Sequence, residues 1–149
     1  MITKKEILFI KELQSKEIRN DLGMFIAEGP TIVNDLLKRG IEYYKIYSTV
    51  DYPFLYNIPS VEIITVKDLE RISSMKTPNS ILGIFYKKPS ITLREMQTCD
   101  NILILNDIQD PGNMGTILRT AEWLGYFNII STLNSVDLYN PKVVQSSMG

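Results

Sequence analysis

Residues 101–124 read NILILNDIQDPGNMGTILRTAEWL and carry the strongest fold signal in the chain. The first five residues are almost all apolar, which is typical of a parallel strand covered on both faces. A polar loop, residues 106–113, follows, and the apolar spacing then predicts a helix from about Met114 to Leu124 that ends at Gly125. This order places the loop at the carboxyl end of the strand, where open α/β sheets bind their ligands.

The predicted helix carries Arg119 and Gly115 on the face opposite Ile117. A cation beside bare backbone near a helix N-terminus suits a phosphate or a ribose that approaches closely. A plainer interpretation is a strand-to-helix turn in which Asp110 or Asn113 caps the helix, with Arg119 on a solvated helix face. The residues alone leave both interpretations open.

Strand and helix patterns alternate on both sides of this stretch, which predicts an α/β fold. The predicted strands cover residues 25–27, 44–50, 61–66, 81–86, 101–105 and 127–131, and further helices are predicted over 4–14, 30–39, 67–75 and 142–148. The chain is expected to divide into a domain of residues 1–88, a partly helical connection of residues 89–100 and a second α/β unit of residues 101–149. The second unit has only two clear strands, so we expect a fragment of a longer protein.

The composition excludes several classes of protein. Apolar residues make up 44% of the 149 residues and charged residues 22%, so a buried core can form. The net charge of -1 argues against a broadly basic nucleic-acid surface, although not against a local basic patch. The chain has no His and one cysteine, Cys99, which excludes His-based catalysis, His metal ligands, a multi-Cys zinc site and an internal disulfide. No metal is expected.

The sequence carries no targeting signal that we recognise. No apolar run approaches the length that crosses a bilayer, so no membrane partner is expected. The N-terminus, MITKKEILFI, has two lysines but lacks the long apolar stretch and the cleavage site of a secretion signal. The expected location is cytoplasmic.

Three segments resemble a known family. The run from Leu105 to Ala121 closely resembles the first motif of the SpoU (TrmH-type) RNA ribose 2′-O-methyltransferases of the SPOUT superfamily. Residues 140–149, NPKVVQSSMG, are similar to the second motif, with Gln145 where many members have Arg. Residues 25–30, FIAEGP, are similar to the start of the substrate-binding domain that often precedes the methyltransferase domain.

The resemblance implies a small N-terminal α/β substrate-binding domain over residues 1–88 and, over residues 101–149, the first part of an α/β-knot (SPOUT) methyltransferase domain. The family's third motif has no counterpart, because the sequence ends first. In the family that part completes a trefoil knot and most of the pocket for the cofactor, S-adenosyl-L-methionine. We therefore expect an incomplete pocket and an inactive fragment. The full-length protein is expected to be a homodimer, with Trp123 as a candidate contact.

The reaction implied by the resemblance is methyl transfer from S-adenosylmethionine to a ribose 2′-hydroxyl of rRNA or tRNA. The family gives the central catalytic role to Arg119 and a supporting role to Asn113. Ser147 and Gly149 match positions near the cofactor pocket. Because a guanidinium is a poor base, we expect Arg119 to orient ribose and phosphate, with the phosphate or a water on it accepting the proton. The sequence leaves open whether Arg119 also acts as a base.

The candidate contacts for RNA phosphates are Lys11, Lys16, Arg19 and Arg119, although a solvated helix face explains the first three equally well. Glu28 is interpreted as a carboxylate near a helix N-terminus, with support of the fold or of the RNA surface as the alternatives. The alternative function is a non-catalytic RNA-binding module. A Rossmann-like nucleotide-binding domain is disfavoured, because no Gly-x-Gly-x-x-Gly run follows a strand.

Overall fold

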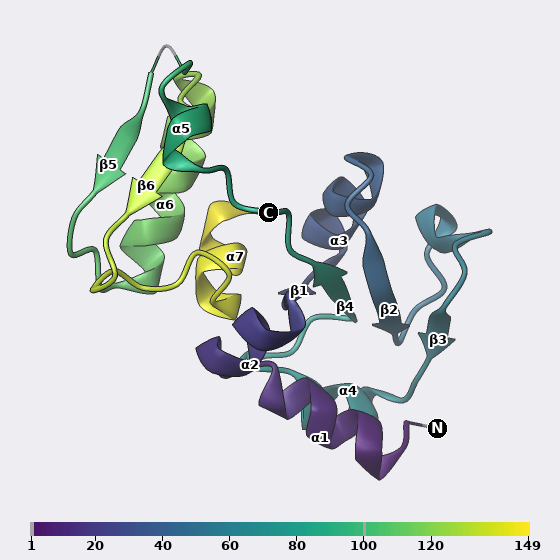
Figure 1. The fold of residues 1–149 in the computed structure, drawn as a ribbon. Coiled ribbons are helices and arrows are strands. Elements are labelled where there is room, and N and C mark those ends of the chain that lie inside the picture. Colours follow the sequence, from purple (N-terminus) through teal and green to yellow (C-terminus); the bar gives the residue numbers. More distant parts are fainter. Residues whose placement is uncertain (1, 100) are drawn as a thin grey trace. The chain divides into compact units, whose positions relative to one another are not determined.

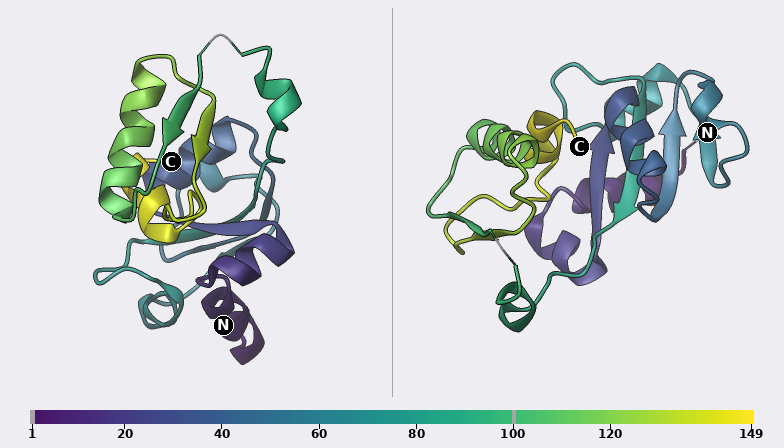
Figure 2. Two further views of the ribbon diagram at one scale, coloured as in Figure 1. Left: turned by 60° about the vertical axis from the view of Figure 1, so that its left-hand side comes forward. Right: turned by 90° about the horizontal axis from the view of Figure 1, so that it is seen from above.

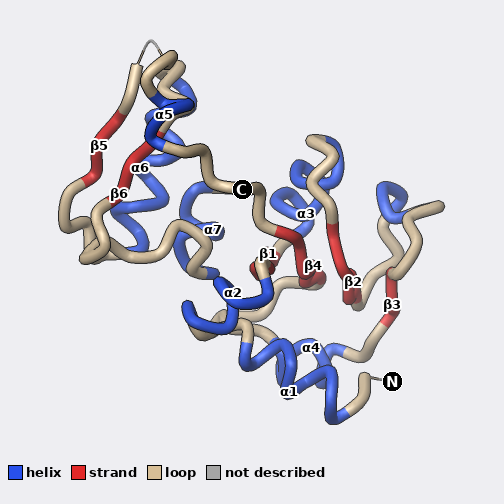
Figure 3. Tube along the Cα trace, viewed as in Figure 1, coloured by secondary structure: helices blue, strands red, loops and turns tan. Residues whose placement is uncertain are grey.

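The computed structural model describes residues 2–99 and 101–149. The chain divides into two compact units: unit 1 runs to Lys87 and also includes Gly149, and unit 2 runs from Lys88 to Met148 (Figure 1). Both units combine helices with strands, as Figure 3 shows. The α/β class predicted from the sequence is therefore confirmed. None of the helices in the described ranges has the length and apolar character needed to cross a membrane.

The first helix of unit 1, α1 (Lys4–Glu12), begins with a capping box. The Thr3 hydroxyl accepts the Glu6 amide N–H at 3.2 Å, and the Glu6 carboxylate accepts the Thr3 amide N–H at 2.9 Å. Ile7 and Ile10 turn inward from this helix and are buried. The helix predicted over residues 4–14 is thus present and ends about two residues earlier.

A second short helix, α2 (Lys16–Leu22), is not predicted by the sequence pattern. Its two apolar residues, Ile18 and Leu22, are too few to form the stripe that marks an amphipathic helix. The helix ends at Gly23, which has the left-handed φ of 63° that favours glycine at such an end.

Unit 1 is built on a mixed four-stranded sheet in the order β1-β4-β2-β3. The strands are β1 (Met24–Glu28), β2 (Tyr43–Ser48), β3 (Val61–Ile63) and β4 (Ile81–Tyr86). β4 runs antiparallel to both β1 and β2, whereas β2 and β3 are parallel. The strand predicted over residues 61–66 is shorter than expected, because the Thr65 hydroxyl accepts the Asp68 N–H at 3.1 Å and caps the next helix.

Helices cover both faces of this sheet (Figures 1 and 2). On one face, α1 and α4 (Val66–Ile72) contribute to a buried cluster that includes Ile10, Ile26, Leu69 and Ile84. α3 (Pro30–Lys38) contacts β1 and β4 with its buried residues Ile32, Val33 and Leu36 on the sheet side. A short 3-10 helix, η1 (Pro53–Leu55), follows β2 in the chain.

Unit 2 contains a parallel pair of short strands, β5 (Leu103–Leu105) and β6 (Ile129–Ser131), which run in the same direction in Figure 2. Its helices are α5 (Leu93–Met96), α6 (Pro111–Trp123) and α7 (Pro141–Ser147). Leu105, Met114 and Val143 form its buried core. α6 begins three residues earlier than the sequence predicts, because Asp110 caps it and Pro111 occupies its first position.

Candidate active site

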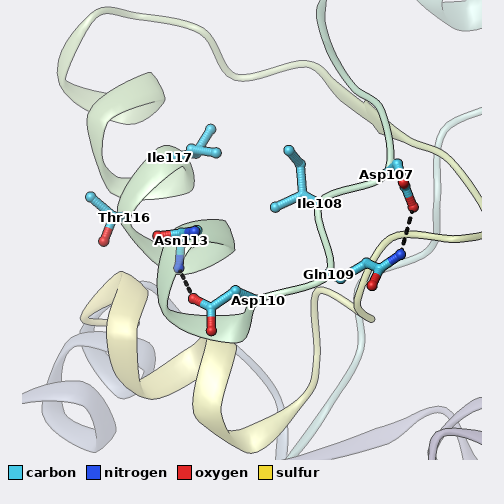
Figure 4. Close-up of a pocket in the computed structure, with 7 residues that line it drawn as sticks. All are labelled: Asp107, Ile108, Gln109, Asp110, Asn113, Thr116 and Ile117. Carbon is cyan, nitrogen blue, oxygen red and sulfur yellow. Dashed lines mark hydrogen bonds between the residues drawn. The ribbon is translucent and has the colours of Figure 1, made fainter.

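A pocket of about 330 Å³ lies at the carboxyl end of β5, where the chain enters α6 (Figure 4). Its walls are formed by Asp107, Ile108, Gln109, Asp110, Asn113, Thr116 and Ile117. All seven residues belong to the strand–loop–helix stretch that the sequence singles out. The pocket therefore lies where an open α/β sheet binds its ligands.

Short hydrogen bonds hold the polar side chains of this pocket. Asp110 Oδ1 accepts the Asn113 backbone N–H at 2.7 Å, so Asp110 is the residue that caps α6. Gln109 Nε2 donates to Asp107 Oδ1 at 3.0 Å. Asn113 lies in the first turn of α6, and its side chain lines the pocket (Figure 4). The pocket thus offers two carboxylates and two carboxamides, a set that suits hydroxyl groups better than an anion.

The other predicted catalytic residue, Arg119, is not among the residues that line this pocket. Arg119 is exposed on α6, and its Cζ lies 5.8 Å from the centre of the Trp123 ring, a cation–π contact. The Trp123 side chain is itself 81% exposed. The structure therefore brings Asn113 to the pocket and Arg119 to the open surface of the same helix.

Gly115 does not form bare backbone beside Arg119, and the expectation that it does is wrong. The residue is buried between α6 and α7. A Cβ atom at this position would lie 1.9 Å from Ser146 Oγ and 2.7 Å from the Ser147 nitrogen. Glycine is needed here so that α7 can approach α6, and a helical wheel of α6 alone carries no signal for that contact.

The second predicted motif forms α7 and its ends. Asn140 Oδ1 accepts the Lys142 N–H at 2.9 Å and caps the helix. Ser147 is half-buried, and its hydroxyl donates to the Val144 carbonyl at 2.9 Å. Gly149 follows the helix with a φ of 97°. Neither Ser147 nor Gly149 lines the pocket at Asn113.

A buried acceptor on α7 bears on cofactor binding. Gln145 Oε1 is buried and, within residues 2–99 and 101–149, has no hydrogen-bond partner. A buried acceptor without a donor is costly, so such an atom is a candidate for a bond from a ligand or from another part of the protein. No group of three or more Cys, Asp or Glu side chains among the described residues is arranged to hold a metal ion.

The three basic residues predicted to contact RNA from the first two helices differ in accessibility. Lys11 and Lys16 are exposed. Arg19 is only 1% exposed, and its Nη1 donates to the Leu13 carbonyl at 3.1 Å and to the Gln14 carbonyl at 2.7 Å. The interpretation of Arg19 as a phosphate contact is therefore wrong: its guanidinium ties the end of α1 to α2 inside the unit.

Glu28 supports the fold, which is one of the alternatives that the sequence leaves open. Its carboxylate is buried and accepts hydrogen bonds from the Ser73 hydroxyl and from the N–H and hydroxyl of Ser74, the last two at 2.9 and 2.8 Å. It makes no side-chain cap at the start of α3, which Gly29 precedes. Glu28 thus anchors the segment that follows α4 rather than capping a helix.

The largest pKa shifts belong to residues of unit 1, whereas the pocket belongs to unit 2. Lys45 Nζ lies 2.6 Å from Glu6 Oε1 and 2.7 Å from Glu62 Oε2. The hydrogen bond from Lys45, with further bonds from Thr3, lowers the pKa of Glu6 from 4.5 to about 2. Although burial lowers the pKa of Lys45, its bonds to Glu6 and Glu62 outweigh this effect and raise it. Burial raises the pKa of the Tyr47 hydroxyl, which donates to Glu6 Oε1 at 3.2 Å. This cluster joins α1 to β2 and β3.

Several further residues contribute to the pocket without being predicted. The sequence indicates the loop as a whole but does not single out Asp107, Gln109 or Thr116. Thr132 and Ser135, which follow β6, contact the pocket loop from another part of the sequence. Parallel strands place their carboxyl ends at one edge, so polar residues after β6 were the signal that could have found them.

Comparison with known proteins finds a family match for the segment that contains the pocket. Residues 100–149 match the SpoU rRNA methylase family model. The human protein named "rRNA methyltransferase 3, mitochondrial" is 32% identical over 150 residues, an alignment that covers 92% of this chain and 35% of that protein. The Bacillus subtilis protein named "23S rRNA (guanosine(2553)-2'-O)-methyltransferase RlmP" is 24% identical over 146 residues, covering 93% of this chain and 56% of that protein.

Among solved structures, the AdoMet-bound rRNA methyltransferase from Sinorhizobium meliloti superposes with a TM-score of 0.84 at 27% identity. The superposition covers 100% of this chain and 59% of that one. The chain therefore spans about a third of the human relative and under two thirds of this structure. The segment that contains the pocket and helices α6 and α7 is therefore the segment that is similar to the SpoU rRNA methylases.

Proposed function

We propose that the chain is part of an RNA methyltransferase that transfers a methyl group from S-adenosylmethionine to a ribose 2′-hydroxyl of rRNA or tRNA. The observation that carries this proposal is the pocket at Asn113, whose lining residues all lie in the segment that matches the family. The name of the Bacillus subtilis relative supports the ribose 2′ position, and the AdoMet-bound Sinorhizobium meliloti structure supports the cofactor.

In this proposal Asn113 and Arg119 act on different parts of one ribonucleotide. The Asn113 side-chain amide, in the pocket wall, offers a donor and an acceptor to ribose hydroxyls. The exposed Arg119 guanidinium offers a fork of N–H donors that suits the neighbouring phosphate. Holding ribose and phosphate together aligns the 2′-oxygen for attack, and positioning of this kind lowers the barrier to group transfer.

The 2′-hydroxyl must lose its proton as the new O–C bond forms. A guanidinium is protonated at neutral pH and is a poor acceptor, so Arg119 orients the substrate instead. Each pocket carboxylate accepts one hydrogen bond within the protein, Asp110 from the Asn113 N–H and Asp107 from Gln109, and we assign their remaining lone pairs to ribose hydroxyls. We therefore assign the proton to the substrate phosphate, directly or through a water molecule on it.

The residues of α7 fit a role in cofactor binding. When bound, S-adenosylmethionine supplies the methyl group. Ser147 and Gly149, which match family positions near the cofactor pocket, are the residues proposed to hold it. Gln145 Oε1, buried without a partner among the described residues, is an acceptor that a ligand N–H or O–H can use.

Lys11 and Lys16 are the proposed RNA phosphate contacts of unit 1, because both are exposed on neighbouring helices. The homodimer and the cytoplasmic location stay predictions. The large exposed fraction of Trp123 supports a surface that a second subunit or another part of the protein covers. The human relative is named mitochondrial, so its name does not support the cytoplasm.

Calorimetric titration with S-adenosylmethionine tests the proposal. We expect the 149-residue chain to bind weakly or not at all, and any longer form that its gene encodes to bind and to methylate rRNA or tRNA. Mass spectrometry of the nucleosides then identifies the methylated position as 2′-O. If no form binds the cofactor while the chain still binds RNA, the methyltransferase proposal fails and a non-catalytic RNA-binding module replaces it.

A further inference from the structure

A hydroxyl-bearing turn follows β6 and lies against the pocket loop. The Thr132 N–H donates to the Leu105 carbonyl at 3.0 Å, which continues the pairing of β6 with β5. The Ser135 N–H donates to the Thr132 carbonyl at 2.9 Å and closes the turn. The Thr132 and Ser135 hydroxyl oxygens lie 3.1 Å apart, and Ser135 is only 6% exposed. The two hydroxyls therefore form a compact polar pair at the end of the sheet.

This pair holds the backbone of the pocket loop. The Asp107 N–H donates to Thr132 Oγ1 at 3.0 Å, and the Ile108 N–H donates to Ser135 Oγ at 3.1 Å. The Val136 N–H donates to the Ile108 carbonyl at 2.8 Å, which adds a third bond between the same two segments. The consecutive amides of Asp107 and Ile108 are thus paired with the two hydroxyls of the turn.

The bond to Thr132 acts on a backbone conformation that needs support. Asp107 has a φ of 56°, in the left-handed region that non-glycine residues rarely adopt. Such a conformation persists only when its surroundings fix it, and it is often found at functional sites. Here it turns the chain from β5 toward the Asp110 cap of α6.

Thr132 and Ser135 do not line the pocket, whereas Asp107 and Ile108 do. Any effect of the hydroxyl pair on the pocket therefore passes through the loop backbone. Because Asp107, Gln109 and Asp110 are consecutive or nearly so, a shift at Asp107 moves the polar wall that faces Asn113 (Figure 4).

We propose that Thr132 and Ser135 are positioning residues for the Asn113 pocket: their hydroxyls fix Asp107 in its left-handed conformation and so set the place of the ribose-binding groups. This inference rests on the proposed function only for the identity of the ligand as a ribonucleotide. The geometric part concerns the loop itself and is testable without any ligand.

The first test follows backbone amides by nuclear magnetic resonance in the ¹⁵N-labelled 149-residue chain. We expect Thr132→Val and Ser135→Ala to speed hydrogen exchange at the Asp107 and Ile108 amides by about tenfold or more, as local opening becomes easier. Thr132→Ser and Ser135→Thr, which keep the hydroxyl, are expected to restore protection. The matched control is Thr98→Val. It removes an exposed hydroxyl that donates to the Glu95 carbonyl at 2.8 Å, and Thr98 does not line the pocket.

Unchanged exchange and unchanged chemical shifts at Asp107, Ile108 and Asn113 in folded Thr132→Val overturn the inference. If Ser135→Ala does not fold, Thr132→Val and its serine counterpart still decide the outcome. Should the chain bind neither S-adenosylmethionine nor RNA, the proposed function fails while the exchange result continues to decide the positioning role.

The second test uses the longest form of the protein that methylates RNA. We expect Ser135→Ala to lower kcat by about 10- to 100-fold, the scale of a small misplacement, with little change in KM for RNA. In an Asn113→Ala background the same substitution is expected to have almost no further effect, because both act on one pocket. Full additivity of the two substitutions, or a loss that Ser135→Thr does not restore, contradicts the proposal.

Discussion

Gly115 of α6 packs directly against Ser146 of α7, and a Cβ atom at Gly115 would lie 1.9 Å from Ser146 Oγ. Alanine favours a helix over glycine by about 1 kcal/mol, but here it also meets the Ser147 backbone nitrogen at 2.7 Å. We predict that Gly115→Ala destabilises unit 2 by about 1–3 kcal/mol, as overpacking of a close contact does. Urea unfolding followed through the signals of residues 101–148 measures the change.

Gly112 provides the control for that experiment, since it lies in the first turn of the same helix. A Cβ atom there meets only the Asp110 side-chain oxygen at 3.1 Å. Gly112→Ala is therefore expected to change the free energy of unfolding by less than Gly115→Ala. If the two substitutions lower the free energy of unfolding equally, the close packing of Gly115 against Ser146 is not the cause of the destabilisation.

The contact between Lys45 and Glu6 predicts acid sensitivity of unit 1. The pKa of Glu6 is lowered from 4.5 to about 2 in the folded protein, so its stabilisation is complete above pH 4.5 and is lost as the pH falls toward 2. We expect Glu6→Gln to remove about 1–2 kcal/mol at neutral pH and to flatten the stability profile between these limits. Glu12→Gln, on the exposed side of the same helix, is the control for the loss of one carboxylate from α1.

Arg19 and Lys16 both lie on α2, but Arg19 is buried and Lys16 is exposed. Removing the buried Arg19 guanidinium leaves the Leu13 and Gln14 carbonyls without a donor. We predict that Arg19→Ala lowers the free energy of unfolding by about 2–4 kcal/mol. Lys16→Ala is expected to leave stability nearly unchanged, to weaken RNA binding and to reduce its salt dependence by about one phosphate contact. A salt dependence that both substitutions reduce equally contradicts this division of roles.

The two units are expected to differ in stability. In unit 2 the strand pair leaves Ile104 exposed, and Phe127 and Leu133 are 75% and 94% exposed. Exposed apolar surface and unpaired strand edges contribute little to the free energy of folding. Hydrogen exchange should therefore be faster for the amides of β5 and β6 than for those of β1 and β4. Equal protection in the two sheets contradicts this prediction.

The sequence predicts those features that depend on residues close to one another in the chain. The order from Leu103 to Trp123 follows from an apolar run, a polar loop and a capped helix, all of which are local. The burial of Arg19 and the contact of Gly115 with Ser146 depend on partners that only the folded chain supplies. Arg19 has the same local signature as an exposed arginine, because helix α2 has no apolar stripe to show which face is buried.

The proposed roles of Asn113 and Arg119 lead to different kinetic effects in a form of the protein that methylates RNA. Asn113 lines the pocket, and we expect Asn113→Ala to lower kcat by about 100- to 1,000-fold, as loss of one aligned polar group at a reacting centre does. Among the described residues, the aromatic contact of the Arg119 guanidinium is the one with the Trp123 ring. Arg119→Lys keeps the charge but loses the planar fork, so it should lower kcat while preserving most of the affinity for RNA.

Neither Asn113→Ala nor Arg119→Lys is expected to change the affinity for S-adenosylmethionine by more than about threefold, because Ser147 and Gly149 are the proposed cofactor contacts. Trp123→Leu is the matched control for Arg119, since it removes the cation–π contact and keeps the guanidinium. If Arg119→Lys is as active as the unchanged protein, charge alone is sufficient at this position. In that case the orienting role fails, and Arg119 contributes only a phosphate contact.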